Sequence, residues 1–312
     1  MDGLERLLSR IAGKEAVAPP SRLLTLKGQA GSLVSLLVSL LRGKTVIFYE
    51  DEDEAMLLKE EIEFLKGEAP VIFPPKSQRL FQRDDQSKRM AFLTRLLLGH
   101  DFVGLFPYSA LGLSLPRREY VLGSMMEIRF AERLLREELI KCLEEGGYEL
   151  VSIVREKGQY AKRGAIVDLF PPSEERPIRI EFLGDEILSI RSFDVRSQRS
   201  LKEHERAIVT PFKEGSLEGS LFDYMEGEMV LVFSSKETIW EHLGRKGRDV
   251  WEKSLKIDMS GISEEGSCEV KVSSNEDLRH FFSSNRSETF IKLGEKLREW
   301  RDMPYLYLFV YT

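Results

Sequence analysis

The sequence predicts an α/β protein, in which a parallel-sheet domain built from two chain segments encloses a small inserted α+β domain. From about residue 20 to 115, short runs of β-branched and aromatic residues alternate with helical stretches. That pattern is typical of a parallel sheet covered on both faces. From Tyr148 to about Ile208 the chain is instead rich in strands and turns, and the α/β pattern returns after Pro211. At 312 residues the chain is long enough for two or three compact units.

The first segment alternates strands with helices. Its buried apolar runs predict strands at Leu23–Lys27, Thr45–Glu50, Val71–Pro74 and Phe102–Phe106. The stretches between them predict helices at Gly31–Leu41, Asp53–Leu65 and Gln86–Leu98. The five acids at residues 50–54 fit the start of a helix, because carboxylates interact favourably with the N-terminal end of its dipole.

The inserted part opens on a helical pattern. Arg129–Glu145 carries apolar residues near i, i+4 spacing, and Gly146-Gly147 ends it. Turns follow at Lys157-Gly158, Pro171-Pro172 and Gly184-Asp185. The last of these separates two apolar alternations, which indicates a β-hairpin.

After Pro211 the alternation resumes. Strands are expected at Met229–Phe233 and Cys268–Val272, with helices at Glu237–Leu243 and Asn275–Phe282. The expected domains are residues 1–118, the insert 119–209, the completing segment 210–285, and the start of a third domain at 286–312. The chain ends within an apolar strand-like run, Tyr305–Tyr311, and domains seldom end so. We therefore expect the N-terminal piece of a longer protein.

Composition narrows the class of protein. Hydrophobic residues make up 42% and charged residues 31%, a balance that excludes wholesale disorder. The net charge of −6 argues against a dedicated nucleic-acid binder. Two cysteines, Cys142 and Cys268, and four scattered histidines form no metal-binding pattern. With neither a signal peptide nor an apolar run of spanning length, the expected location is cytoplasmic.

The turn after the first strand occupies the place where a phosphate-binding loop would lie, but its residues do not match the motif. A P-loop needs Lys to neutralise phosphate and Ser or Thr to hold Mg²⁺ after its last glycine. Here the turn carries Gly28 and Gly31, followed by Ser32 and Leu33, so both chemical groups are missing. Gly43-Lys44-Thr45 follows a helix and precedes a strand, which is the wrong context. We expect no ATP hydrolysis, catalytic residue or cofactor in this chain.

Three stretches carry a family resemblance. The first holds Gly158, Tyr160, Arg163-Gly164 and Asp168–Pro171; the others are Arg179–Ile187 (RIEFLGDEI) and Phe193–Ser200 (FDVRSQRS). They resemble the second domain of the bacterial transcription-repair coupling factor (Mfd) and, less closely, that of the excision-repair helicase UvrB. The third stretch favours the coupling factor. UvrB also keeps an intact P-loop, whereas the coupling factor's UvrB-like module has lost its nucleotide site.

The resemblance implies a UvrB-like fold and a binding role. In both families this small domain binds UvrA, which here implicates Arg163, Arg179 and Leu183. The resemblance implies that later domains, outside this chain, bind RNA polymerase, translocate on DNA and use ATP with Mg²⁺. As an alternative reading of the residues, Arg163 and Arg179 are strand arginines paired with Glu181 or Asp168 and have no binding role.

Two other functions stay open. One is an active UvrB-type damage-verification ATPase, which the missing P-loop lysine argues against. The other is a non-specific DNA-binding module. It would use a basic stretch that Asp84-Asp85 interrupts, made of Lys76, Arg79, Arg83, Lys88 and Arg89.

Overall fold

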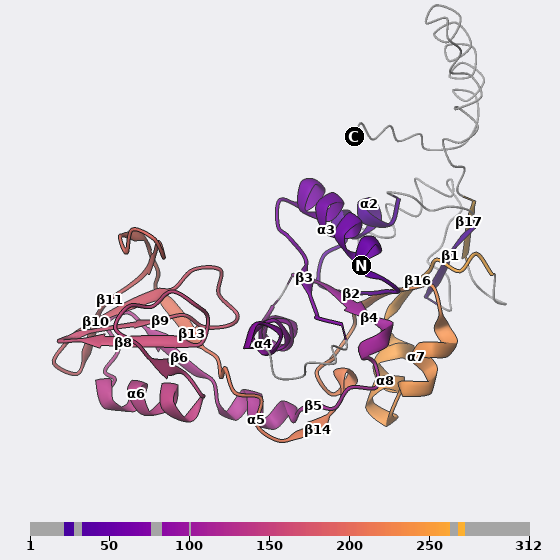
Figure 1. The fold of residues 1–312 in the computed structure, drawn as a ribbon. Coiled ribbons are helices and arrows are strands. Elements are labelled where there is room, and N and C mark those ends of the chain that lie inside the picture. Colours follow the sequence, from indigo (N-terminus) through magenta and orange to yellow (C-terminus); the bar gives the residue numbers. More distant parts are fainter. Residues whose placement is uncertain (1–21, 28–32, 76–82, 100, 263–267, 272–312) are drawn as a thin grey trace, which may run out of the picture. The chain divides into compact units, whose positions relative to one another are not determined.

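A computed structural model describes the chain in five stretches, residues 22–27, 33–75, 83–99, 101–262 and 268–271 (Figure 1). The helix expected at 275–282 and the domain start expected at 286–312 lie outside these described residues. The chain divides into two compact units. The first unit comprises residues up to 70, 227–241 and those from 248 onward. The second unit comprises residues 71–226 and 242–247. The domain boundaries expected from the sequence stay predictions.

Strands from both ends of the chain form a parallel sheet in the first unit. Its order is β17-β1-β16-β15-β2, and every neighbouring pair is parallel. The strands are β1 (Leu23–Lys27), β2 (Lys44–Tyr49), β15 (Val230–Phe233), β16 (Leu255–Asp258) and β17 (Cys268–Lys271). Almost all their side chains with described burial are inaccessible to solvent, as expected of strands covered on both faces. The prediction of a mixed α/β protein with a parallel sheet is confirmed.

Helices alternate with these strands along the chain. They are α2 (Leu33–Leu40), α3 (Glu52–Lys66), α7 (Lys236–His242) and α8 (Arg245–Lys253). The Asp51 carboxylate accepts a hydrogen bond from the Glu54 N–H at 2.9 Å and caps α3, and Gly67 ends it at φ +77°. The acidic run therefore begins a helix, as predicted.

The second unit contains a short parallel strand pair and a long helix. β3 (Val71–Ile72) pairs with β4 (Phe102–Pro107), and α4 (Arg83–Leu98) packs on them. Ring centroids of Phe92 on α4 lie 5.4 Å from Phe73 and 5.7 Å from Phe106. Smaller elements of this unit are η1 (Tyr108–Ala110), β5 (Leu115–Pro116), α5 (Arg118–Gly123), β14 (Leu217–Gly219) and η2 (Leu221–Asp223).

The second unit also contains a six-stranded sheet, here called the inserted sheet (Figure 1). Its order is β12-β11-β10-β9-β8-β7, antiparallel except for the β7–β8 pair. The strands are β7 (Glu149–Leu150), β8 (Gln159–Arg163), β9 (Ile166–Leu169), β10 (Ile178–Leu183), β11 (Glu186–Phe193) and β12 (Ser200–Glu203). Gly184, at φ +63°, turns the expected hairpin between β10 and β11.

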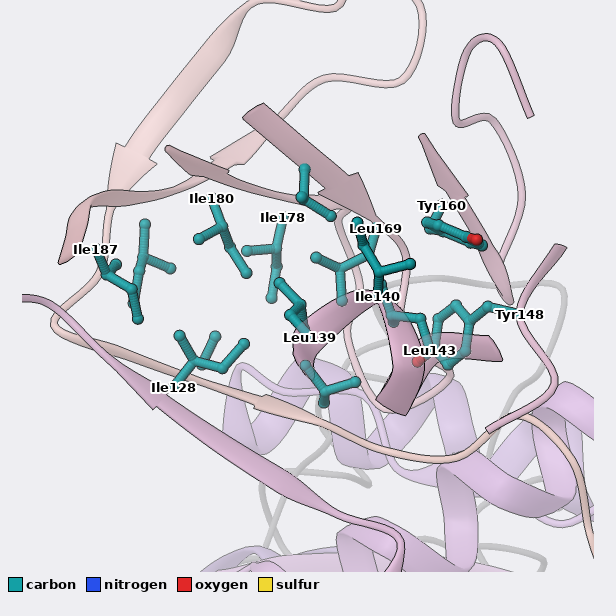
Figure 2. Close-up of a cluster of buried hydrophobic side chains, with 14 of the residues drawn as sticks. Ile128, Leu139, Ile140, Leu143, Tyr148, Tyr160, Leu169, Ile178, Ile180 and Ile187 are labelled. Atoms are coloured by element: carbon teal, nitrogen blue, oxygen red, sulfur yellow. The ribbon is translucent and has the colours of Figure 1, made fainter. Parts of the chain in front are cut away.

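One face of the inserted sheet packs on helix α6 (Arg136–Glu145). Figure 2 shows Leu139 and Leu143 of α6 opposite Ile178 and Ile180 of β10, within a cluster of buried apolar side chains. Ile128 joins the cluster from a second, two-stranded sheet of β6 (Met126–Arg129) and β13 (Arg206–Val209). This core fixes which face of the inserted sheet remains for other contacts.

The helix predicted over Arg129–Glu145 is wrong in its first half. Arg129 ends strand β6, and the helix begins only at Arg136. Two features explain the difference: Ala131 has φ +60°, which a helix cannot contain, and Ile128 pairs with Ala207 of β13. Strand pairing far along the chain overrides the local helical pattern. No helix in the described part of the chain is long and apolar enough to cross a membrane.

Candidate functional site

The face of the inserted sheet opposite α6 carries the residues singled out in the sequence. Side chains alternate along β10: Ile178, Ile180 and Phe182 are buried, whereas Arg179, Glu181 and Leu183 are partly or fully exposed. The outer face is defined here by residues that share this side of the sheet: Arg163, Asp168, Arg179, Glu181, Leu183 and Arg191.

Strand register brings these residues together. Arg179 is opposite Asp168 on β9 and Arg191 on β11. Glu181 is opposite Ile166, which is in turn opposite Arg163 on β8. Directly opposed residues share one face of a sheet, with Cβ atoms about 4.5–5.5 Å apart. Arg163, Arg179 and Leu183 therefore lie on one surface.

Arg179 is held firmly within the sheet. Its Nε and Nη2 donate to the two carboxylate oxygens of Asp168 at 2.7 and 2.9 Å, and Asp168 is only 1% exposed. Nη1 donates to the Gln198 carbonyl at 3.2 Å, and the guanidinium lies 4.7 Å from the ring centroid of Phe193. The hydrogen bond to Asp168 raises the pKa of Arg179. Pairing with Asp168 was the alternative drawn from the sequence, but the pair is buried, not solvated.

Arg163 and Leu183 are far more accessible. Arg163 is exposed, and its Nη2 donates to the Ser152 carbonyl at 2.8 Å. Leu183, at the end of β10, is 68% exposed. An exposed leucine and a lightly bonded arginine on the same face offer both an apolar contact and hydrogen-bond donors to a partner.

Sequence reasoning missed Arg191. Its Nη2 donates to the Glu181 carboxylate at 2.5 Å, and the Ser189 hydroxyl donates to the same oxygen at 3.3 Å. Arg191 and Glu181 are about equally accessible, with 30% and 32% of their side chains exposed. Only the strand register, which a sequence does not display, places Arg191 beside Arg179.

The third motif stretch builds a turn that supports the outer face. The Asp194 carboxylate accepts hydrogen bonds from the N–H and hydroxyl of Ser197, at 2.7 and 2.8 Å, and these bonds lower its pKa. Gln198 has φ +59°, and its amide donates to the carbonyls of Val154 and Val195. The turn presents the Gln198 carbonyl to Arg179, so this stretch has a structural role.

The basic stretch considered for DNA binding is largely paired within the second unit. Arg89 donates through Nε and Nη2 to Glu214 at 2.6 and 2.8 Å, with 10% and 13% of the two side chains exposed. Lys88 pairs with Asp84 at 2.6 Å.

Arg83, at the start of α4, is engaged in the same way. It pairs with Glu149 at 2.8 Å, donates to the Gly158 carbonyl and lies over the ring of Phe212. The remaining candidates, Lys76 and Arg79, lie outside the described residues.

Of the degenerate P-loop, the structure describes only Leu33. Gly28, Gly31 and Ser32 lie outside the described residues, and Leu33 is the first residue of α2. The absence of a working nucleotide site therefore stays a prediction. The described stretches contain no group of three or more His, Cys, Asp or Glu side chains that could hold a metal ion.

Residues 126–214, which include the outer face, match the family model of the UvrB interaction domain, so this part of the chain is similar to domains of that class. The chain is 29% identical over 204 residues to the transcription-repair-coupling factor of Haemophilus influenzae. This alignment covers 64% of this chain and 18% of that protein.

Two further relatives carry the same name. The Escherichia coli protein is 32% identical over 188 residues, covering 59% of this chain and 16% of its own length. The Bacillus subtilis protein is 31% identical over 163 residues, and the alignment covers 52% of this chain and 13% of that protein. The predicted resemblance is confirmed, and the chain spans less than a fifth of the length of these relatives.

Proposed function

We propose that this chain binds UvrA through the outer face of its inserted sheet and so recruits the excision machinery in transcription-coupled repair. The observation that carries the proposal is the position of Arg163 and Leu183. Both belong to the motif shared with the family, both lie on one face, and both are open to a partner.

The exposure of these side chains has a physical meaning. A large apolar side chain in water gains free energy when a partner covers it, by roughly 25 cal/mol per Å² of apolar surface buried. The exposed Arg163 guanidinium adds charge-assisted hydrogen bonds to a partner carboxylate. Leu183 supplies apolar area without a ring, so it makes no stacking contact.

The proposed role concerns recruitment, with no catalysis by this chain. Binding to RNA polymerase and ATP-driven movement on DNA with Mg²⁺ would belong to parts of the relatives beyond the matched region, which is 13–18% of their length. The name transcription-repair-coupling factor describes those relatives, and it supports placing this chain in the same process.

The test is a titration of the chain with purified UvrA, comparing wild type with an Arg163→Ala/Leu183→Ala variant. We expect the variant to bind at least tenfold more weakly, a loss of about 1.4 kcal/mol. The matched control is Lys141→Ala, which removes an exposed cation from α6, the helix packed on the other face of the sheet. The control should bind like wild type. Absence of binding by folded wild-type chain would refute the proposed function.

A further inference from the structure

We propose that Arg191 is a further anchor of the outer face and binds a carboxylate of the partner. The inference rests on the proposed function, because it names a residue and a partner chemistry for the same surface. It extends the set suggested by resemblance, which holds Arg163, Arg179 and Leu183.

Arg191 is directly opposite Arg179 across the β10–β11 pair, so the two side chains share the outer face. Glu181 lies two residues along β10, between Arg179 and Leu183. Arg191 therefore shares one surface with Arg179, Glu181 and Leu183.

Arg191 also differs from Arg179 in how many of its hydrogen-bond donors are used. An arginine side chain has five N–H donors in a planar fork. Arg179 makes three hydrogen bonds through its three nitrogens, all within the chain. Within the described part of the chain Arg191 makes one, from Nη2 to Glu181. Its Nε is buried and has no hydrogen-bond partner among the described residues. The buried Nε is out of reach of a partner, but Nη1 of Arg191 makes no hydrogen bond within the described residues, so of these two neighbouring arginines it is Arg191 that has unused capacity to bind a partner.

Glu181 places a carboxylate among the arginines of the outer face. An unpaired carboxylate among the outer-face arginines would repel an acidic partner. The hydrogen bonds from Arg191 and from the Ser189 hydroxyl keep the Glu181 carboxylate paired within the chain. They also fix the orientation of the arginine. This contact uses a single nitrogen of Arg191, unlike the two-nitrogen contact between Arg179 and Asp168. A partner carboxylate can therefore approach Nη1 of Arg191 without breaking the contact between Arg191 and Glu181.

The arrangement predicts different effects for the two partners of the pair: a loss of affinity at Arg191 and no loss at Glu181. Arg191→Ala removes the anchor and exposes the Glu181 charge to the partner, so affinity falls. Glu181→Gln keeps the shape and an oxygen acceptor for Arg191 but removes the competing negative charge, so affinity stays equal or rises. A purely structural pair would respond to either substitution with a loss.

The experiment is a titration of the whole chain against purified UvrA at two salt concentrations. The variants are Arg191→Ala, Arg191→Lys and Glu181→Gln, with Lys141→Ala as the control. Arg191→Ala should weaken binding at least fivefold and flatten the salt dependence, because an interfacial charge has been removed. Arg191→Lys should recover part of the affinity, since it keeps the charge but loses the planar fork. Glu181→Gln should bind as tightly as wild type or more tightly.

Two outcomes would count against the inference alone, and a third would be failure of the proposed function. Wild-type affinity in Arg191→Ala would remove Arg191 from the binding surface while leaving the proposed function intact. Equal losses in Arg191→Ala and Glu181→Gln would show that the pair is structural. Failure of wild-type chain to bind UvrA would remove the proposed function itself. Thermal unfolding of each variant separates loss of binding from loss of fold.

Discussion

At the scale of single residues, the two arginines suggested by resemblance have different physical situations. Arg179 is 16% exposed and forms a two-nitrogen ion pair with Asp168, itself 1% exposed. Arg163 is exposed and makes one hydrogen bond to a backbone carbonyl. Removing one partner of a buried pair leaves an uncompensated charge in a poorly solvated place, whereas an exposed arginine leaves none.

Arg179→Ala should therefore cost far more stability than Arg163→Ala. We expect a loss of about 3–5 kcal/mol for Arg179→Ala and less than about 1 kcal/mol for Arg163→Ala. Urea denaturation of the two variants beside wild type measures both values. Equal, small losses would mean that the Asp168 pair contributes little to the fold. If the prediction holds, any UvrA-binding defect of Arg179→Ala must be corrected for unfolded chain.

At the scale of elements, helix α4 is attached to the segment that follows β13. Arg89 of α4 pairs with Glu214 in a largely buried contact. Arg83 lies over the ring of Phe212, which is two residues before Glu214 in the sequence. The hydrogen bond to Glu214 raises the pKa of Arg89. Gly158 fits against Phe212 because it has no side chain: a Cβ there would lie 2.4 Å from the ring, and its φ is +77°.

The Arg89–Glu214 pair gives a prediction for this attachment. Arg89→Ala should cost about 3–5 kcal/mol, because it strands the Glu214 carboxylate. Hydrogen exchange in α4 should speed up. The matched control is Lys88→Ala on the same helix, whose exposed pair with Asp84 is worth no more than about 0.5 kcal/mol. The double variant Arg89→Met/Glu214→Met should recover much of the loss, and a failure to recover would argue against an unpaired charge as the cause.

Elements also show where sequence reasoning succeeds and where it fails. The strand at Leu23–Lys27 has the predicted bounds, since a buried apolar run indicates a strand by itself. β16, which contains Lys256, and helix α8, rich in charge, were not predicted. Lys256 is 7% exposed, and its ammonium donates to the Trp251 carbonyl, a partner that only the fold supplies. Arg191 was missed for the same reason: its place on the outer face depends on strand register.

At the scale of the whole molecule, charge argues against a DNA-binding role. The chain carries a net charge of −6. Of the five basic residues considered for DNA, the three within the described residues are each paired with a carboxylate. Arg89 in particular has little to offer a phosphate, because two of its nitrogens bind the Glu214 carboxylate in a largely buried pair that DNA binding would first have to break.

This predicts weak binding to duplex DNA with little dependence on salt. Each phosphate neutralised by a protein cation steepens the fall of affinity with salt, so a basic binding module loses orders of magnitude between 50 and 200 mM. For this chain we expect less than about a tenfold change, corresponding to one or two phosphate contacts. Fluorescence anisotropy of a labelled duplex at both salt concentrations measures it. A change of a hundredfold or more would require about four contacts and would favour the DNA-binding alternative. In that case UvrA titrations would have to be repeated without DNA, because shared DNA would bridge the two proteins without any contact at the outer face.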